Sequence, residues 1–415
     1  MEKLIFDNGL KLIYEHREGN VTSFCIGYDA GALVESEEEF GLAHIVEHMV
    51  FKGTKNRCEY EINCLCDKIF GFHNAMTNYP YVIYYGTTLS KDFEEGFKIY
   101  ADILLNPTFP EEGFNEEIAV ICEELKEWKE DLYQFCEDEM LYNAFKKRRI
   151  KDLIIGNENS IRDKKVADVK QFYDKYYHNG NCVISVVSSL ALEEIKNIVS
   201  KYFDCDSMKC KSVNSFIELY ENNVCGTNIS RVKNLNGAKI MYCYPIHYLK
   251  EKEIKALNIF NASFGTGVSS FLYDAVRTQN GLAYEINSKV KNEKGIKLFC
   301  ISAGVSKDKV SKALELINEE IEKVKKLNNY FTNEKINENS RTLKLKKLLS
   351  LERSIELSKN LTTYEIMYGN SEKVYSEDEF DDLDSSFIME VLNKVLVNPT
   401  IQIITNSGDD EHFDK

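Results

Sequence analysis

The chain has 415 residues, of which 43% are hydrophobic and 29% are charged, and its formal net charge is −15. This length suits two domains of ordinary size. The acidic balance disfavours nucleic acid and anionic membrane surfaces as partners, and it favours basic or neutral peptides. No stretch approaches the roughly 20 consecutive apolar residues of a membrane span, so we expect no membrane partner.

The cysteines and the N-terminus indicate a cytoplasmic protein. The first seven residues lack the basic and then apolar layout of a signal peptide. The twelve cysteines are scattered along the chain, as is typical of reduced thiols. Cys64 and Cys66 are the only close pair. No second pair has zinc-finger spacing, so we interpret them as thiols of a packed helix.

The first half of the chain mixes strands and helices. Residues 3–32 alternate apolar and polar side chains around the turn signal Asp7-Asn8-Gly9, which predicts a hairpin strand followed by another strand. Residues 41–51 then predict a helix. Further strands are expected at residues 81–87 and 181–188, and further helices at residues 92–105, 114–142 and 192–202.

The second half repeats this plan after a loose, polar stretch around residues 205–225. A strand is expected at residues 238–244, then a helix ending near Phe264, and further helices at residues 307–326 and 333–369. Aligning Phe51 with Phe264 places Leu257, Phe260 and Asn261 opposite His44, Glu47 and His48. We therefore predict an α+β fold of two tandem repeated domains, residues 1–210 and 225–415, with metal chemistry only in the first.

The motif His44-Ile45-Val46-Glu47-His48 lies in the first predicted helix. Residues four apart on a helix share one face, so both imidazoles project together with Glu47 beside them. Two neutral imidazoles and a more distant carboxylate would hold Zn²⁺ and leave one position open for water. The alternative, ordinary polar residues on a surface helix, is disfavoured by this spacing. The order His-x-x-Glu-His is the inverted form of the zinc-protease motif.

The carboxylate ligand is expected on the helix around residue 120. Glu117 and Glu124 are seven residues apart and face the same side of that helix, whereas Glu123 points about 100° away from Glu124. One of the two can bind the ion while the other orients a ligand or modulates the charge of the site. The spacing alone does not assign the two roles.

Residues 41–54 resemble the signature helix of the pitrilysin-type zinc peptidases, and the resemblance extends over most of the chain. Residues 120–124 resemble the segment of that family that bears the third ligand. The resemblance implies that Glu124 is this ligand and that Glu117 is the supporting glutamate. It also implies one Zn²⁺ per chain, held by His44, His48 and Glu124.

Three further segments resemble that family. Residues 74–77 are similar to a strand that holds the substrate backbone as an added strand, which implies substrate contacts at Asn74 and Ala75. Residues 155–161 are similar to a family loop. Residues 277–284 resemble an arginine-tyrosine element, in which Arg277 and Tyr284 would reach the scissile carbonyl. Taken alone, these two residues are typical of a surface arginine and a packed tyrosine. His73 is interpreted as a strand residue rather than a fourth ligand.

The hypothesis from the sequence is a zinc metalloendopeptidase. Glu47 would accept a proton from water and deliver it to the leaving amine, while Arg277 and Tyr284 stabilise the oxyanion. The resemblance implies half of a clamshell chamber that admits short or unfolded peptides. It also implies a homodimer with composite active sites, with a heterodimer as the alternative. Two other functions stay open: a dedicated leader-peptide processing peptidase, and a non-catalytic scaffold subunit, which the intact ligands disfavour.

Overall fold

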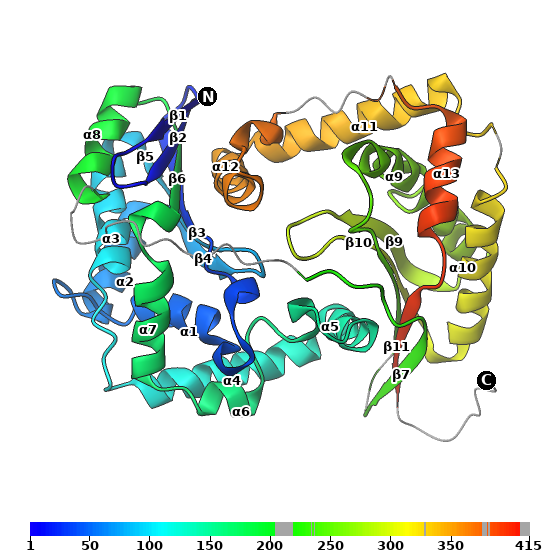
Figure 1. Ribbon diagram of the computed structural model, residues 1–415, viewed down its shortest axis with the longest axis horizontal. Coiled ribbons are helices and arrows are strands. Elements are labelled where there is room, and N and C mark those ends of the chain that lie inside the picture. The colour runs from blue at the N-terminus through cyan, green and yellow to red at the C-terminus, as the bar shows by residue number, and fades with distance from the viewer. Residues whose placement is uncertain are drawn as a thin grey trace. The chain divides into compact units, whose positions relative to one another are not determined.

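The computed structural model describes residues 1–203, 219–233, 235, 237–327, 329–375, 380 and 382–406 (Figure 1). The chain forms two compact units, each assembled from three segments. The first comprises residues 1–126, 153–218 and 347–376, and the second comprises residues 127–152, 219–346 and 377–415. The predicted contiguous domains, 1–210 and 225–415, do not account for this exchange of segments. The predicted junction lies largely outside the described residues.

The first unit is built on a six-stranded sheet in the order β1-β2-β6-β3-β5-β4. Only β2 and β6 run parallel, and the other neighbours are antiparallel. The central strands β3, β5 and β6 are buried almost throughout, whereas β4 is an edge strand. The strands are β1 (Glu2–Ile5), β2 (Lys11–His16), β3 (Val21–Tyr28), β4 (Phe70–Thr77), β5 (Val82–Leu89) and β6 (Cys182–Ser188).

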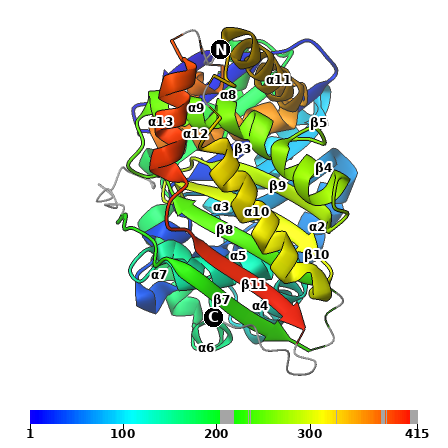
Figure 2. The same ribbon diagram turned by 90° about the vertical axis from the view of Figure 1, so that its right-hand side faces the viewer.

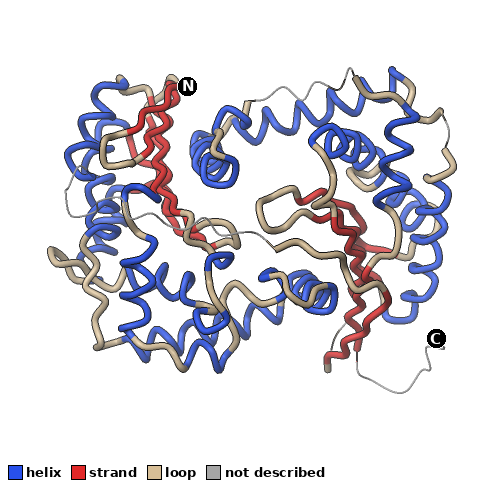
Figure 3. The backbone as a smooth tube through the Cα atoms, viewed as in Figure 1, coloured by secondary structure: helices blue, strands red, loops and turns tan. Residues whose placement is uncertain are grey.

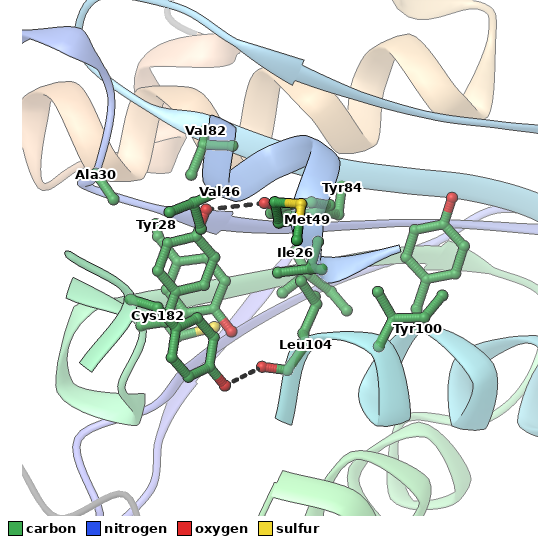
Figure 4. Packing of buried hydrophobic residues seen from close by; sticks show 14 of the residues in the cluster. Ile26, Tyr28, Ala30, Val46, Met49, Val82, Tyr84, Tyr100, Leu104 and Cys182 are labelled. Atoms are coloured by element: carbon green, nitrogen blue, oxygen red, sulfur yellow. Dashed lines mark hydrogen bonds between the residues drawn. The ribbon is translucent and has the colours of Figure 1, made fainter. Parts of the chain in front are cut away.

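One face of this sheet carries most of the helices of the first unit. Val46 and Met49 of the first helix pack into the buried cluster that contains Ile26, Tyr28 and Tyr84 (Figure 4). This apolar contact fixes which side of the helix faces away from the sheet. The helices of the unit's first two segments are α1 (Leu42–Val50), α2 (Glu59–Ile69), α3 (Phe93–Leu105), α4 (Phe114–Glu130), α6 (Glu158–Arg162), α7 (Val166–Tyr176) and α8 (Leu192–Phe203).

The opposite face of the sheet is covered by α12 (Ser354–Tyr368), which comes from the C-terminal half of the chain. Beside an apolar cluster that α12 shares with β2 and β6, small hydroxyl side chains take part in this contact. Thr362 Oγ1 donates to Ser185 Oγ at 2.8 Å, and the hydroxyls of Ser185 and Ser358 lie 2.8 Å apart. A Cβ atom at Gly27 would lie 2.5 Å from Thr362 Cγ2. Glycine therefore permits the close approach of α12 to β3.

The second unit is built on a five-stranded sheet in the order β7-β11-β8-β10-β9, with only β7 and β11 parallel (Figure 2). The strands are β7 (Gly226–Val232), β8 (Ala238–Pro245), β9 (Ala283–Lys291), β10 (Leu298–Val305) and β11 (Thr400–Asn406). Helices α9 (Glu251–Phe264), α10 (Val310–Val324) and α13 (Ser385–Val395) share a buried cluster with one face, and the first turns of α11 (Asn333–Leu351) join it. Helix α5 (Leu132–Ala144) covers the other face.

The two units repeat one plan. Each has a mostly antiparallel sheet with one parallel pair, an apolar helical layer on one face, and a single helix on the other face that comes from the other half of the chain (Figure 3). In α9, Leu257 and Phe260 are fully buried where the alignment places the first two motif residues of α1. The predicted α+β class, with two repeated domains of sheet and helices, is confirmed.

Two predictions of a single long helix are wrong, because each predicted helix is two helices in the structure. The helix expected at residues 114–142 is interrupted at Asp131, whose carboxylate caps α5 by accepting hydrogen bonds from the backbone of Tyr133 and Gln134. The helix expected at residues 333–369 ends at Leu351, and α12 begins at Ser354. Apolar periodicity continues across both breaks, so the sequence pattern conceals them. The helix expected around Cys64 and Cys66 is α2, whose bounds the sequence pattern did not give. No helix among the described residues is long and apolar enough to cross a bilayer.

Candidate metal centre and active site

The start of α1 is fixed by backbone contacts. Glu35 accepts hydrogen bonds from the amides of Gly41 at 3.3 Å and Ala43 at 2.8 Å, so a carboxylate lies at the positive end of the helix. Gly41 has a φ of 91° and packs against Gly156 and the carbonyl of Ile155. The start of the segment predicted as a loop at residues 155–161 thus lies against the first turn of α1, whereas its second half is the short helix α6.

Helices α1 and α4 bring His44, His48 and Glu124 together. Glu124 Oε1 lies 3.6 Å from His44 Nε2, and Glu124 Oε2 lies 3.5 Å from His48 Nε2. One possible donor atom from each residue lies within 4.8 Å of the other two, and this is the only such group of three that the described residues contain. His44 is 8% exposed, whereas the other two are partly exposed.

This donor set fits a zinc ion. Two atoms that each bind Zn²⁺ at about 2.1 Å with tetrahedral angles lie about 3.4 Å apart. The observed separations of 3.5 and 3.6 Å, each to a different oxygen of Glu124, are close to that value, and one donor atom from each of the three residues lies within 4.8 Å of the other two. Two imidazoles and one carboxylate form the three-ligand type of site that leaves a fourth position for water.

The two histidines have opposite electrostatic environments. Burial, together with the smaller effect of the neighbouring His48, lowers the pKa of His44 to about 4. Burial also opposes the charge of His48, but hydrogen bonds to Glu117 and Glu124 outweigh burial and raise its pKa to about 9. The pKa of Glu124 is lowered, chiefly by its hydrogen bond with His48. Without an ion, a proton on His48 balances the two carboxylates.

A chain of charged groups extends behind His48. His48 Nδ1 lies 2.7 Å from Glu117 Oε1, and Lys52 Nζ lies 2.5 Å from Glu117 Oε2 and 2.9 Å from Glu59 Oε1. A carboxylate on the remote nitrogen of a ligating imidazole orients the ring and directs its other nitrogen toward the ion. Glu117 thus lies at the remote nitrogen of His48, and its role as the supporting glutamate stays a prediction.

Glu47 is held by Thr77, the last residue of β4. Thr77 Oγ1 donates a hydrogen bond of 2.5 Å to Glu47 Oε2. Burial raises the pKa of Glu47, although the contact with Thr77 opposes the shift. A carboxylate whose pKa lies closer to neutrality is better matched to accepting and returning a proton.

The edge strand β4 carries Asn74 and Ala75. The Asn74 side chain is exposed, and its Oδ1 accepts a hydrogen bond from the Ala75 amide at 2.9 Å. His73 Nδ1 lies 3.1 Å from the hydroxyl of Tyr100 and does not belong to the group of three. The thiols of Cys64 and Cys66 on α2 are free, one exposed and one buried.

Arg277 and Tyr284 lie in the second compact unit, whereas the metal group lies in the first. Arg277 is on a π-helical turn, Tyr273–Thr278, and its Nη1 donates to the carbonyl of Tyr284 at 2.5 Å. The Tyr284 side chain is 56% exposed. The Arg277 side chain is therefore anchored on the backbone of Tyr284, while the Tyr284 side chain remains accessible.

Sequence reasoning did not identify Lys52 or Thr77 as parts of the site. Lys52 follows His48 by four residues but lies in the turn after α1, so helical spacing alone did not place it beside Glu117. Thr77 is 30 residues from Glu47, and no spacing signal connects the two. Only the pairing of β4 in the sheet brings its hydroxyl to the carboxylate.

Zinc binding to the metal-free protein should release about one proton at pH 7.5, because ligands bind in deprotonated form. His48, with a pKa of about 9, is protonated there, and His44, with a pKa of about 4, is already neutral. The charge on His48 stabilises the metal-free fold below about pH 6.5, and this contribution is lost as pH rises toward 9. Calorimetry in buffers of different ionisation enthalpy measures the release. Glu117→Gln should reduce it; an unchanged value would contradict this account.

Replacing Lys52 by methionine should weaken zinc binding by about 10-fold, because Glu117 loses the cation that holds its second oxygen. The affinity is measured by competition with a chelator of known zinc affinity. Lys55→Met is the matched control, since it changes the charge equally at an exposed side chain three residues farther along. Equal affinities of the two variants would remove Lys52 from the site.

Two family models match the chain. Residues 11–158 match the model described as Insulinase (Peptidase family M16), and residues 165–343 match the model described as Peptidase M16 inactive domain. A protein named as the uncharacterized zinc protease YmxG of Bacillus subtilis is 26% identical over 352 residues, which cover 83% of each chain. The beta subunit of the mitochondrial-processing peptidase of Rattus norvegicus is 26% identical over 197 residues, which cover 48% of this chain and 40% of that protein.

The fold is also similar to solved structures. The crystal structure of a protease from Helicobacter pylori superposes with a TM-score of 0.85 at 21% identity, covering 97% of this chain and 99% of that one. The metal motif lies within the first family model, and the repeat without the motif lies largely within the model described as inactive. From these matches, the chain belongs to peptidase family M16.

Proposed function

We propose that the protein is a zinc-dependent endopeptidase that binds one zinc ion through His44, His48 and Glu124 and uses Glu47 as general base. The observation that carries the proposal is the grouping of the three donor atoms beside Glu47. The intact set of ligands also disfavours a non-catalytic scaffold. The name of the Bacillus subtilis relative, a zinc protease, supports the same chemistry.

The residues around the proposed ion divide the work. When bound, zinc supplies Lewis acidity to the carbonyl oxygen and makes a coordinated water more acidic. Glu47 accepts the proton from water at the oxygen that Thr77 leaves free, and later delivers it to the leaving amine. Glu117 keeps the His48 ring in the orientation that points Nε2 toward Glu124.

The proposed substrates are short or unfolded peptides. A peptide that adds to the edge strand β4 beside Asn74 and Ala75 would be held by its backbone, and only an extended segment can do so. This mode demands little of the substrate side chains. The net charge of −15 adds a weak preference for peptides without acidic residues.

We further propose that Arg277 and Tyr284 stabilise the oxyanion at the zinc site of a partner chain, in a homodimer that encloses the substrate. The exposed phenol of Tyr284 and the anchored guanidinium of Arg277 support a role as preorganised donors. A heterodimer with a related chain is the alternative. A cytoplasmic location remains a prediction.

A dedicated leader-peptide processing peptidase is the second candidate function. The observation that favours it is the similarity to the beta subunit of the mitochondrial-processing peptidase. The two candidates share the site and differ only in substrate range. Turnover of many unrelated unfolded peptides at comparable kcat/KM favours the general peptidase, and turnover of one leader sequence favours the processing enzyme.

Glu47→Gln should keep zinc and lower kcat by about 10²- to 10⁴-fold, because the amide cannot accept the proton while the ligands are unchanged. Zinc content by mass spectrometry and hydrolysis of a quenched peptide measure the two effects. His44→Ala should lose zinc and activity together. Native turnover by Glu47→Gln excludes the proposed base, and a zinc-loaded wild type that cleaves no peptide supports the scaffold.

Coexpression of Glu47→Gln with Tyr284→Ala should restore activity if each site uses the partner's tyrosine. Random assembly makes half of the dimers mixed, and each mixed dimer has one complete site, so about a quarter of wild-type activity is expected. Each variant alone is the control and should be nearly inactive. No recovery in dimers shown to be mixed would contradict the composite site.

A further inference from the structure

The edge strand β9 begins with a β-bulge at Tyr284. The pairing with β10 passes from Gly304–Glu285 to Val305–Ala283, so Tyr284 is an extra residue without an opposite partner. Ala283 and Ile286 both belong to the buried cluster, although they are three residues apart. In a regular strand, Tyr284 would alternate onto the buried face with Ile286. The bulge turns its side chain to the other face of the sheet.

The ring of Tyr284 then lies where residue 304 has no side chain. A Cβ atom at Gly304 would lie 2.3 Å from Cζ and 2.5 Å from the hydroxyl oxygen of Tyr284. Gly304 is not among the glycines with positive φ, so the backbone there does not itself require glycine. The space taken by the tyrosine ring is therefore what excludes a side chain at this position.

The surroundings hold this arrangement from two sides. Arg277 donates to the carbonyl of Tyr284 at 2.5 Å, and its guanidinium lies 4.9 Å from the ring centroid of Tyr273. Lys239, which is 2% exposed, pairs with Glu285, and these two residues flank Gly304 on the neighbouring strands β8 and β9. The hydrogen bond from Arg277 thus fixes the backbone of Tyr284, and the phenol ring packs over Gly304.

We propose that Gly304 is a positioning residue for Tyr284. Because glycine has no side chain, it leaves space for the phenol ring, and this space keeps the ring in the orientation needed for catalysis. This inference rests on the proposed function, in which the hydroxyl of Tyr284 stabilises the oxyanion. Gly304 touches neither substrate nor metal in this role and acts only through the tyrosine.

The test is a double-mutant cycle with Gly304→Ala and Tyr284→Ala. A methyl group at residue 304 meets the free end of a side chain rather than backbone, so the protein should fold and the ring should move aside. A displacement of about 1 Å in a catalytic group can cost about 100-fold in rate. We therefore expect Gly304→Ala to lower kcat about 10- to 100-fold with KM within about 2-fold, and to have no further effect in the Tyr284→Ala background.

Ser302→Ala is the matched control, because Ser302 lies two residues earlier on the same strand and the same face as Gly304. Its kcat should stay within about 2-fold of the wild type. An equal loss of kcat from Gly304→Ala with and without the Tyr284 ring would show a general structural effect and overturn the proposal. Native kcat in Gly304→Ala would also overturn it, provided that Tyr284→Phe is impaired.

The Tyr284→Phe variant tests the role of the Tyr284 hydroxyl separately from the role of Gly304. Native turnover by this variant would remove the proposed role of Tyr284 and the inference with it, whereas impaired turnover leaves Gly304 to be judged by the cycle. If Gly304→Ala does not fold, ¹⁹F NMR of wild-type protein that contains fluorotyrosine tests whether the ring of Tyr284 is ordered. A ¹⁹F chemical shift of Tyr284 that differs from its value in unfolded protein supports an ordered ring over Gly304. A chemical shift equal to the unfolded value overturns the proposal.

Discussion

The candidate metal centre depends on one constraint, namely that α1 and α4 face each other with their ionisable side chains. Helix α1 presents two imidazoles four residues apart, and α4 presents two carboxylates seven residues apart. Four ionisable groups in a partly buried space are costly unless positive charge balances the carboxylates. In the metal-free protein His48 carries that charge, and Lys52 balances the outer oxygen of Glu117. The same arrangement is suited to replace the proton of His48 by a divalent cation.

The two repeated units differ in the residues that their corresponding helices carry. In the first unit, α1 carries His44, Glu47 and His48, while the corresponding helix of the second unit places Leu257 and Phe260 in its core. The second unit is then free to expose Arg277 and Tyr284 on a π-helical turn and a β-bulge, two local irregularities that are frequent at functional sites.

Each sheet is covered on its second face by a helix from the other half of the chain, and both contacts include buried polar pairs. Hydroxyl groups of Ser185, Ser358 and Thr362 meet beneath α12. Beneath α5, Glu137 pairs with Lys291 in a largely buried setting. Buried polar contacts add little net stability but define one orientation, because a shifted helix would leave their donors unpaired. These polar pairs therefore favour one orientation of each helix on its sheet.

The sequence by itself determined the motif on α1, the candidate carboxylates on α4 and the α+β class, because ligand spacing and apolar periodicity are local properties of a helix or a strand. The resemblance added the choice between Glu124 and Glu117, which spacing left open. Tertiary structure decided the breaks after Glu130 and Leu351, the exchange of α5 and α12, and the contacts of Lys52, Thr77 and Gly304. Those features depend on which distant segments pair, and neither the periodicity of one segment nor the spacing of one motif carries that information.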